Sequence, residues 1–166
     1  AAHPMLNHRG FINLTPEKLL LGSDYVWDKA YRLSKINEMG LRFPKGVVFE
    51  DCEFHFKCFT QITNIYYTDE ILYNYRVRSE SIVTNAGKGN VNIKDLFEVD
   101  RHIYDYLVET GKLENYKNTY LFLIGRHIKS VLLPNQKEKV INYTDELLNH
   151  IGFPQNFEAA AVNENT

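Results

Sequence analysis

Residues 93–111 read IKDLFEVDRHIYDYLVETG, and their apolar side chains recur at helical spacing. The residues that set this spacing are Ile93, Leu96, Phe97, Ile103 and Leu107. An amphipathic α-helix places such residues on one face. Gly111 can adopt the left-handed conformation that commonly ends a helix. The stretch therefore predicts a helix that begins near Ile93, stops at Gly111 and buries one face.

The same spacing returns twice further along the chain. It predicts a second helix that ends before Pro134 and a third that ends near Ile151. The apolar positions are Tyr116, Tyr120, Ile124 and Val131 in the second helix, and Val140, Ile141, Leu147, Leu148 and Ile151 in the third. Three such helices can bury their apolar faces against one another. We therefore expect residues 93–151 to form one packed helical subdomain, followed by a flexible tail at 152–166.

The segment before these helices is also patterned mainly as helix over residues 16–62. The string Thr15-Pro16-Glu17 has the chemistry of a helix start, and we expect a short helix that runs to Gly22. Apolar residues between Tyr25 and Glu38 recur at three and four residues, which predicts an amphipathic helix ended by Gly40.

A proline and a glycine at positions 44 and 46 predict a loop, followed by a short strand at residues 47–49. The acids Glu50 and Asp51 then open another helix, because the dipole favours acids at a helix N-terminus. Two β-prone runs follow at residues 65–67 and 71–75.

Glycines and asparagines at residues 85–92 predict a linker. We therefore expect an α+β, mainly α, protein in which residues 1–84 form one part, residues 93–151 a second part, and residues 152–166 a tail.

Bulk composition excludes some classes of function. A net charge of −2 gives no positive field that would attract nucleic acid. No apolar run approaches the roughly 20 residues that cross a bilayer.

Cys52 and Cys58 lie six residues apart in one predicted helix, so their side chains diverge and a disulfide is not expected. With no apparent secretory signal, we expect a cytoplasmic protein and leave open a peripheral position at the inner membrane face.

Three strings, in this order, carry a resemblance to a known family: VWDKAYR at 26–32, RFPKGVVFEDCEF at 42–54 and DEILYNYRVRSESI at 69–82. Together they resemble the C-terminal part of bacterial family 2 glycosyltransferases, which have the GT-A fold and build surface polysaccharides. The resemblance implies transfer of a sugar, with inversion, from a nucleotide-sugar donor to a glycan or lipid-linked acceptor. It also implies that residues 1–84 are the acceptor-side part of the catalytic domain.

In that family an Asp-x-Asp string holds Mg²⁺ or Mn²⁺ and the sugar diphosphate, and this sequence contains no such string. We therefore expect the donor site and the metal ligands to lie before Ala1, no metal ligand in this chain, and no activity from this part alone. Processive members of the family carry a Gln-x-x-Arg-Trp string. Its absence here predicts addition of a single sugar.

By resemblance, Asp51 is the base that takes the proton of the acceptor hydroxyl, and Glu50 supports it. A positioned carboxylate suffices for that task. On residue chemistry alone, a helix cap is the favoured interpretation of Asp51. His55, one turn later, could pair with Asp51 or be an exposed histidine.

The resemblance also implies a set of substrate contacts in the first and third strings. Trp27 could stack on a sugar, and Lys29 could offset the charge of the diphosphate. A core tryptophan and a solvated lysine are the alternatives. The loop of the third string is expected to close over the diphosphate with Tyr75, Arg76, Arg78 and Ser81, of which Arg76 is the preferred phosphate contact.

A zinc site and a non-enzymatic function are the alternatives to this assignment. Cys52, His55 and Cys58 spread around one helix, so they do not predict a zinc site. A non-enzymatic helical interaction module that docks through residues 93–151 is the second candidate function. An isolated acceptor-side part would expose surfaces that the missing half covers, so self-association is also expected.

Overall fold

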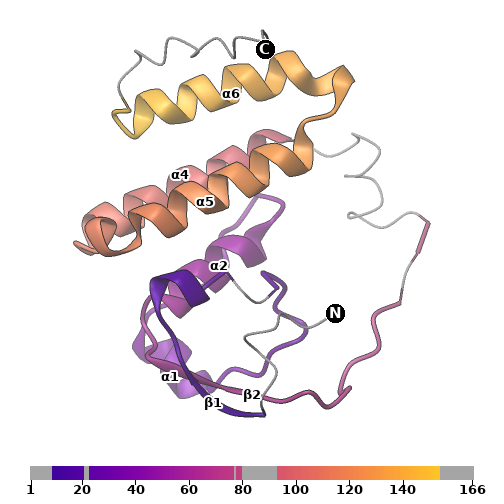
Figure 1. Cartoon of the computed structure of the whole chain (residues 1–166), viewed down its shortest axis with the longest axis vertical. Helices are drawn as coiled ribbons and strands as arrows, with labels where there is room; N and C mark the ends of the chain where they lie inside the picture. Colours follow the sequence, from indigo (N-terminus) through magenta and orange to yellow (C-terminus); the bar gives the residue numbers. More distant parts are fainter. Residues whose placement is uncertain (1–8, 21–22, 77, 80–92, 154–166) are drawn as a thin grey trace, which may run out of the picture.

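A computed structural model describes residues 9–20, 23–76, 78–79 and 93–153. Its elements are β1 (Gly10–Asn13), the 3₁₀ helix η2 (Pro16–Lys18), α1 (Leu33–Glu38), α2 (Glu50–Phe59), β2 (Asn64–Tyr67), α4 (Ile93–Glu109), α5 (Leu113–Val131), the 3₁₀ helix η3 (Pro134–Gln136) and α6 (Lys137–His150). In Figure 1, α6 lies on one side of the α4–α5 pair, and α1, α2 and the two strands lie on the other. The described chain is mainly helical with one small sheet, which confirms the expected α+β, mainly α, class.

The three predicted helices after residue 92 are present and pack against one another. All five apolar positions that predicted α4 are buried, with Ile103 and Leu107 completely inaccessible to solvent. The helix ends where expected, because Gly111 has a φ of 65°. In α6 the match is looser, since Ile141 is exposed while Val140 is buried. The periodicity of the apolar side chains therefore located these helices correctly.

Helix α4 also packs against α2, so one apolar core extends from the N-terminal segment into the three helices. Polar contacts reinforce this packing. The hydroxyl groups of Thr60 and Tyr106 lie 3.0 Å apart, and Nδ1 of His102 lies 2.7 Å from a carboxylate oxygen of Glu53. These contacts hold α2 against α4 near both ends of α2.

The helix expected between residues 25 and 38 is wrong over its first half, since only α1 (Leu33–Glu38) is helical. Lys29 explains the difference. Its ammonium group donates to the carbonyl oxygens of Ser23 and Tyr25 at 2.7 and 2.5 Å, so the lysine side chain satisfies the Tyr25 carbonyl group, which the expected helix would have paired. Gly40 ends α1 in the left-handed conformation, as expected, with a φ of 66°.

The strand expected at residues 47–49 is also wrong. The amide of Val48 donates to the side chain of Asp95 at 3.0 Å, and Phe49 is left-handed with a φ of 73°, a conformation that does not continue a strand. Residues 71–75 likewise form no strand.

The run at 65–67 does form a strand, β2. It pairs antiparallel with β1, which the sequence analysis did not predict; Phe11 lies opposite Tyr66. The expected short helix after Thr15 is a single 3₁₀ turn, Pro16–Lys18, and its predicted end at Gly22 lies outside the described residues.

Two further expectations concern the described part of the chain. Both cysteines are free thiols, as predicted from their spacing. Among the described helices, none has the length and apolarity that a membrane crossing requires. The expected linker at 85–92 and nearly all of the expected tail fall outside the described residues.

Candidate functional site

Four aromatic rings form a partly exposed stack, which we call the aromatic stack: Tyr25, Trp27, Tyr73 and Tyr75. The ring of Trp27 lies 5.3 Å from Tyr25 and 5.0 Å from both Tyr73 and Tyr75, with interplanar angles of 20° to 30°. Trp27 remains 37% exposed. Flat, accessible aromatic surface of this kind suits contact with the apolar face of a sugar ring. The structure thus brings together Trp27 and Tyr75, two residues that the sequence predicted to contact substrate.

Lys29 holds the loop that carries Trp27. Besides the two carbonyl oxygens, its ammonium group lies 2.6 Å from a carboxylate oxygen of Asp28. The side chain is only 17% exposed. The charge of Lys29 is therefore already engaged by its own loop in this structure.

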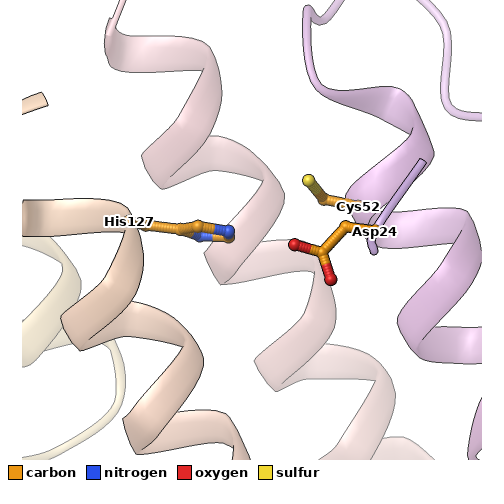
Figure 2. Close-up of side chains that lie close together, drawn as sticks. All are labelled: Asp24, Cys52 and His127. Atoms are coloured by element: carbon orange, nitrogen blue, oxygen red, sulfur yellow. The ribbon is translucent and has the colours of Figure 1, made fainter. Parts of the chain in front are cut away.

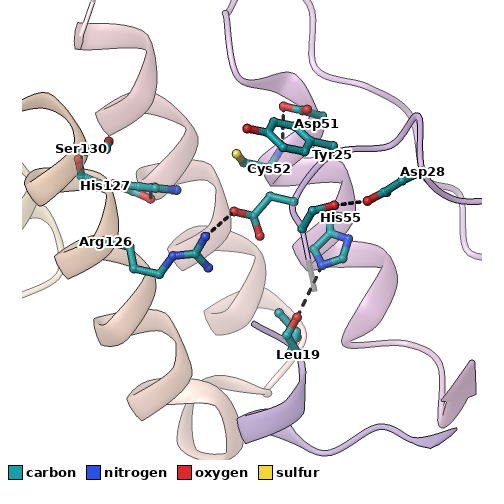
Figure 3. Close-up of polar contacts among 12 residues, drawn as sticks. Leu19, Tyr25, Asp28, Asp51, Cys52, His55, Arg126, His127 and Ser130 are labelled. Atoms are coloured by element: carbon teal, nitrogen blue, oxygen red, sulfur yellow. Dashed lines mark hydrogen bonds and ion pairs between the residues drawn. The ribbon is translucent and has the colours of Figure 1, made fainter. Parts of the chain in front are cut away.

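The acids Glu50 and Asp51 are the first two residues of α2. The residue that caps this helix is Phe49, not Asp51, and its side chain makes no capping hydrogen bond. The carboxylate of Asp51 instead accepts a hydrogen bond from the amide of Cys52 at 3.1 Å. Figure 3 shows Asp51 beside the ring of Tyr25, which places this carboxylate next to the aromatic stack.

The electrostatic surroundings raise the pKa of Asp51. Partial burial is the largest cause, because it disfavours the charged carboxylate, and the neighbouring negative charge of Glu50 acts in the same direction. Hydrogen bonds from backbone amides oppose the shift but do not cancel it. The helix N-terminus was expected to favour the ionised form, so burial outweighs that effect here. A carboxylate with a raised pKa is a better proton acceptor once it is ionised.

The remaining predicted substrate contacts lie after the stack. Arg76 and Arg78 are both exposed, and Ser81 lies outside the described residues. Exposed guanidinium groups next to Tyr75 are suited to bind a phosphate.

His55 does not pair with Asp51. It is buried, its Nε2 lies 3.5 Å from the carbonyl oxygen of Leu19, and its ring packs 4.0 Å from that of Phe59. Both earlier interpretations, a partner of Asp51 and an exposed histidine, are therefore wrong. Burial first, and then the positive charge of Lys29, lower the pKa of His55 to about 4.

An open apolar groove of about 540 Å³ lies on the α1 side of the molecule. Its lining includes Val26, Tyr31, Phe43 and Phe54. The rings of Phe43 and Phe54 stack 4.2 Å apart, and Tyr31 meets Phe54 edge-on. Val26, which lines the groove, is adjacent in sequence to Trp27 of the aromatic stack.

The structure also gathers three potential metal ligands that the sequence analysis did not connect: Asp24, Cys52 and His127. Their ligand atoms all lie within 4.8 Å of one another. Figure 2 shows the three side chains facing each other, with His127 reaching across from α5. The residues are 28 and 75 positions apart along the chain, so no local spacing could have signalled the cluster. We call these residues the Asp-Cys-His cluster.

Two charged neighbours surround the cluster. Arg126 lies 3.1 Å from Oδ2 of Asp24, and Nδ1 of His127 lies 2.7 Å from Oδ1 of the fully buried Asp100. Burial raises the pKa of the Cys52 thiol, and the nearby carboxylates of Asp24 and Asp51 add to the shift. The cluster is therefore a semi-enclosed polar site between α2 and α5.

The Mg²⁺ or Mn²⁺ implied by the family resemblance does not fit the residues of this chain. Those ions prefer sites built from oxygen ligands, whereas the one candidate cluster among the described residues offers a thiol and an imidazole beside a single carboxylate.

Comparison with known proteins supports a distant relationship. The chain is 30% identical over 135 residues to a Bacillus subtilis (strain 168) protein described as "Putative glycosyltransferase EpsH". The aligned region covers 77% of this chain but only 38% of that relative. This similarity relates the chain to glycosyltransferases. No family model matches the sequence, and no solved structure matches it.

Proposed function

We propose that the chain is the acceptor-side portion of an inverting family 2 (GT-A) glycosyltransferase. The whole protein would add one sugar from a nucleotide-sugar donor to a glycan or lipid-linked acceptor in bacterial surface polysaccharide synthesis. The observation that carries the proposal is the position of the half-buried Asp51 carboxylate beside the aromatic stack. The similarity to a described glycosyltransferase supports it independently.

In the proposed reaction, an acceptor sugar stacks on Trp27 and Tyr75 and presents a hydroxyl group to Asp51. The carboxylate takes the hydroxyl proton while the oxygen forms a bond to the anomeric carbon of the donor. The bond from that carbon to the diphosphate breaks, and the diphosphate leaves with the electron pair. Attack opposite the leaving group inverts the configuration. The negative charge of Glu50 helps keep the pKa of Asp51 raised.

The other predicted residues take supporting roles in this proposal. Arg76 contacts the diphosphate, and Arg78 and Ser81 belong to the same phosphate-facing loop. Lys29 acts as a positioning residue, because its ammonium group fixes the loop that carries Trp27. This differs from the direct charge compensation that the sequence suggested.

We place the nucleotide-binding half and its Mg²⁺ or Mn²⁺ ligands in a part of the whole protein that this chain does not include. The chain spans 38% of the length of the relative, which leaves room for such a half. The division also implies that the chain by itself is inactive. The reaction would take place in the cytoplasm, with the inner membrane face as the location of a lipid-linked acceptor.

Calorimetry tests whether donor binding requires the part of the whole protein that this chain does not include. UDP-sugars and Mn²⁺ are titrated into the 166-residue chain and, in parallel, into the whole protein. We expect donor binding by the whole protein and no micromolar binding by the chain, since the chain has no Asp-x-Asp string. Micromolar binding of a UDP-sugar to the chain itself would contradict the proposed division.

A further inference from the structure

The Asp-Cys-His cluster combines side chains from three separate parts of the fold. Asp24 lies in the loop before α1, Cys52 in the first turn of α2 and His127 near the end of α5. Each offers one ligand atom, and these atoms lie within 4.8 Å of one another. Because α2 and α5 are fixed by the shared apolar core, the packing of the fold sets the positions of two of the three ligands.

His127 provides independent evidence for a ligand at this position. Its side chain is 9% exposed, and its Nε2 atom is buried without a hydrogen-bond partner. Such an orphaned buried nitrogen carries an energetic cost unless something binds it. Figure 2 shows the imidazole directed at Asp24 and Cys52. The unpartnered atom therefore points into the cluster.

The partner of the other ring nitrogen fixes the chemistry of His127. Oδ1 of Asp100 lies 2.7 Å from Nδ1, so Nδ1–H can donate to the carboxylate and leave the lone pair of Nε2 directed at the cluster. A carboxylate behind a histidine is the usual arrangement around metal-binding imidazoles, because it orients the ring and raises its basicity. Asp100 thus has the position of a supporting residue for a metal ligand.

We infer that Asp24, Cys52 and His127 bind one divalent cation of the zinc class, with a fourth position open to water or another ligand. Zinc accepts mixed thiolate, imidazole and carboxylate ligands, whereas a thiol excludes a site designed for Mg²⁺ or Ca²⁺. The charges also balance: the thiolate of Cys52 and the carboxylates of Asp24 and Asp100 carry three negative charges, and the divalent cation together with Arg126 carries three positive charges. This inference does not depend on the proposed glycosyltransferase function.

The geometry requires only a small contraction of the cluster. With ligand bonds of about 2.0–2.3 Å, the ligand atoms around a tetrahedral zinc ion lie roughly 3.3–3.8 Å apart. The present separations extend to 4.8 Å, so side-chain shifts of about 1 Å would close the site. Asp24 can keep its ion pair with Arg126 through Oδ2 while its other oxygen binds the cation.

The chain contains a matched control, because it has a second cysteine that lies outside the cluster. Cys58 is buried on the same helix as Cys52 and is also a free thiol. Zn²⁺ is titrated into the metal-free 166-residue chain in competition with a chromophoric chelator, and Co²⁺ is used as a spectroscopic substitute. We expect one bound equivalent with a Kd below about 1 µM and a thiolate-to-cobalt charge-transfer band in the near ultraviolet.

The variants assign the ligands. Cys52→Ser should remove the charge-transfer band and weaken Zn²⁺ binding by more than about 100-fold, whereas Cys58→Ser should leave both unchanged. Asp100→Asn should weaken binding by about 10- to 100-fold, the usual effect of a residue that supports a ligand. Equal binding by wild type and Cys52→Ser, or loss of binding in Cys58→Ser, would overturn the inference.

A labelling experiment on the wild-type chain covers the case in which a variant fails to fold. Iodoacetamide is added with and without one equivalent of Zn²⁺, and peptide mass spectrometry measures alkylation at Cys52 and Cys58 separately. Zn²⁺ should slow alkylation of Cys52 at least tenfold. An unchanged rate at Cys52 would show that the cation does not bind its thiol and would refute the site.

Discussion

Nδ1 of His127 lies 2.7 Å from Oδ1 of Asp100, and this contact joins α5 to α4 inside the core. Asp100 has no exposed surface at all. Replacing it with Leu leaves Nδ1 of His127 buried without a partner. Removing one member of a buried pair typically costs about 3–5 kcal/mol. We therefore predict that Asp100→Leu lowers the free energy of unfolding by about this amount, as measured by urea denaturation.

An exposed pair of the same chemistry serves as the control for this prediction. Nε2 of His150 lies 2.6 Å from Oδ1 of Asp105, but the side chains of these two residues are 34% and 44% exposed. Exposed pairs contribute about 0–1 kcal/mol. Asp105→Leu should therefore change the free energy of unfolding by less than about 1 kcal/mol. Similar losses in the two variants would show that the buried pair has no special role.

The aromatic stack can be followed directly, because Trp27 is the one tryptophan in the sequence. Tyr75→Ala removes a ring that lies 5.0 Å from the indole. We predict a red-shifted emission and faster quenching by acrylamide, since the indole becomes more exposed to water. Aromatic pairs of this kind contribute about 0.5–1.5 kcal/mol, so a modest loss of stability should accompany the change.

Phe122 offers a matched control for the stack, since it is an exposed ring that lies on α5 and is not one of the four rings of the stack. Phe122→Ala should leave the emission of Trp27 unchanged. If Tyr75→Ala also leaves it unchanged, the stack does not exist in solution.

The buried His55 predicts a specific dependence of stability on pH. Its folded pKa of about 4 lies below the ordinary value of 6.5, so the unfolded chain binds a proton first as the pH falls. Stability that is present above pH 6.5 is therefore lost as the pH falls towards 4. The expected loss from this group is roughly 2–3 kcal/mol between pH 7 and pH 4.5.

A neutral substitution isolates this contribution. Urea denaturation of wild type and His55→Gln at both pH values gives two changes in the free energy of unfolding. The change should be smaller in His55→Gln by the amount that His55 contributes, because all other titrating groups are common to both proteins. Parallel losses in the two proteins would mean that His55 is not buried in its neutral form.

The sequence predicted α4, α5 and α6 because their apolar side chains alone define the buried faces. Ile103 and Leu107 lie one turn apart and are both completely buried, so their spacing carried the necessary information. The segment around Lys29 had similar spacing but forms a loop. Hydrogen bonds from one lysine side chain to two backbone carbonyl oxygens replaced the helical pattern there, and no apolar periodicity records such contacts.

The candidate site was predictable only where its parts are close in sequence. Asp51 and Glu50 were identified from one short string, and Trp27 and Tyr75 from two others, although their stacking was not foreseen. The contact of His127 with the region of Cys52 depends on how α5 packs across the molecule. The proximity of residues from two such distant helices can be seen only in the tertiary structure.

The role of Asp51 as the base in glycosyl transfer is tested most directly by Asp51→Asn in the whole protein. Asparagine keeps the size of the side chain and the oxygen that accepts the amide hydrogen of Cys52, but it cannot take a proton. Steady-state transfer and thermal unfolding are measured for wild type, Asp51→Asn and Glu50→Gln. We predict that Asp51→Asn unfolds within about 3 °C of wild type while kcat falls by roughly two to four orders of magnitude, and that Glu50→Gln loses less. Turnover by Asp51→Asn within about threefold of wild type would contradict the assignment of Asp51 as the base.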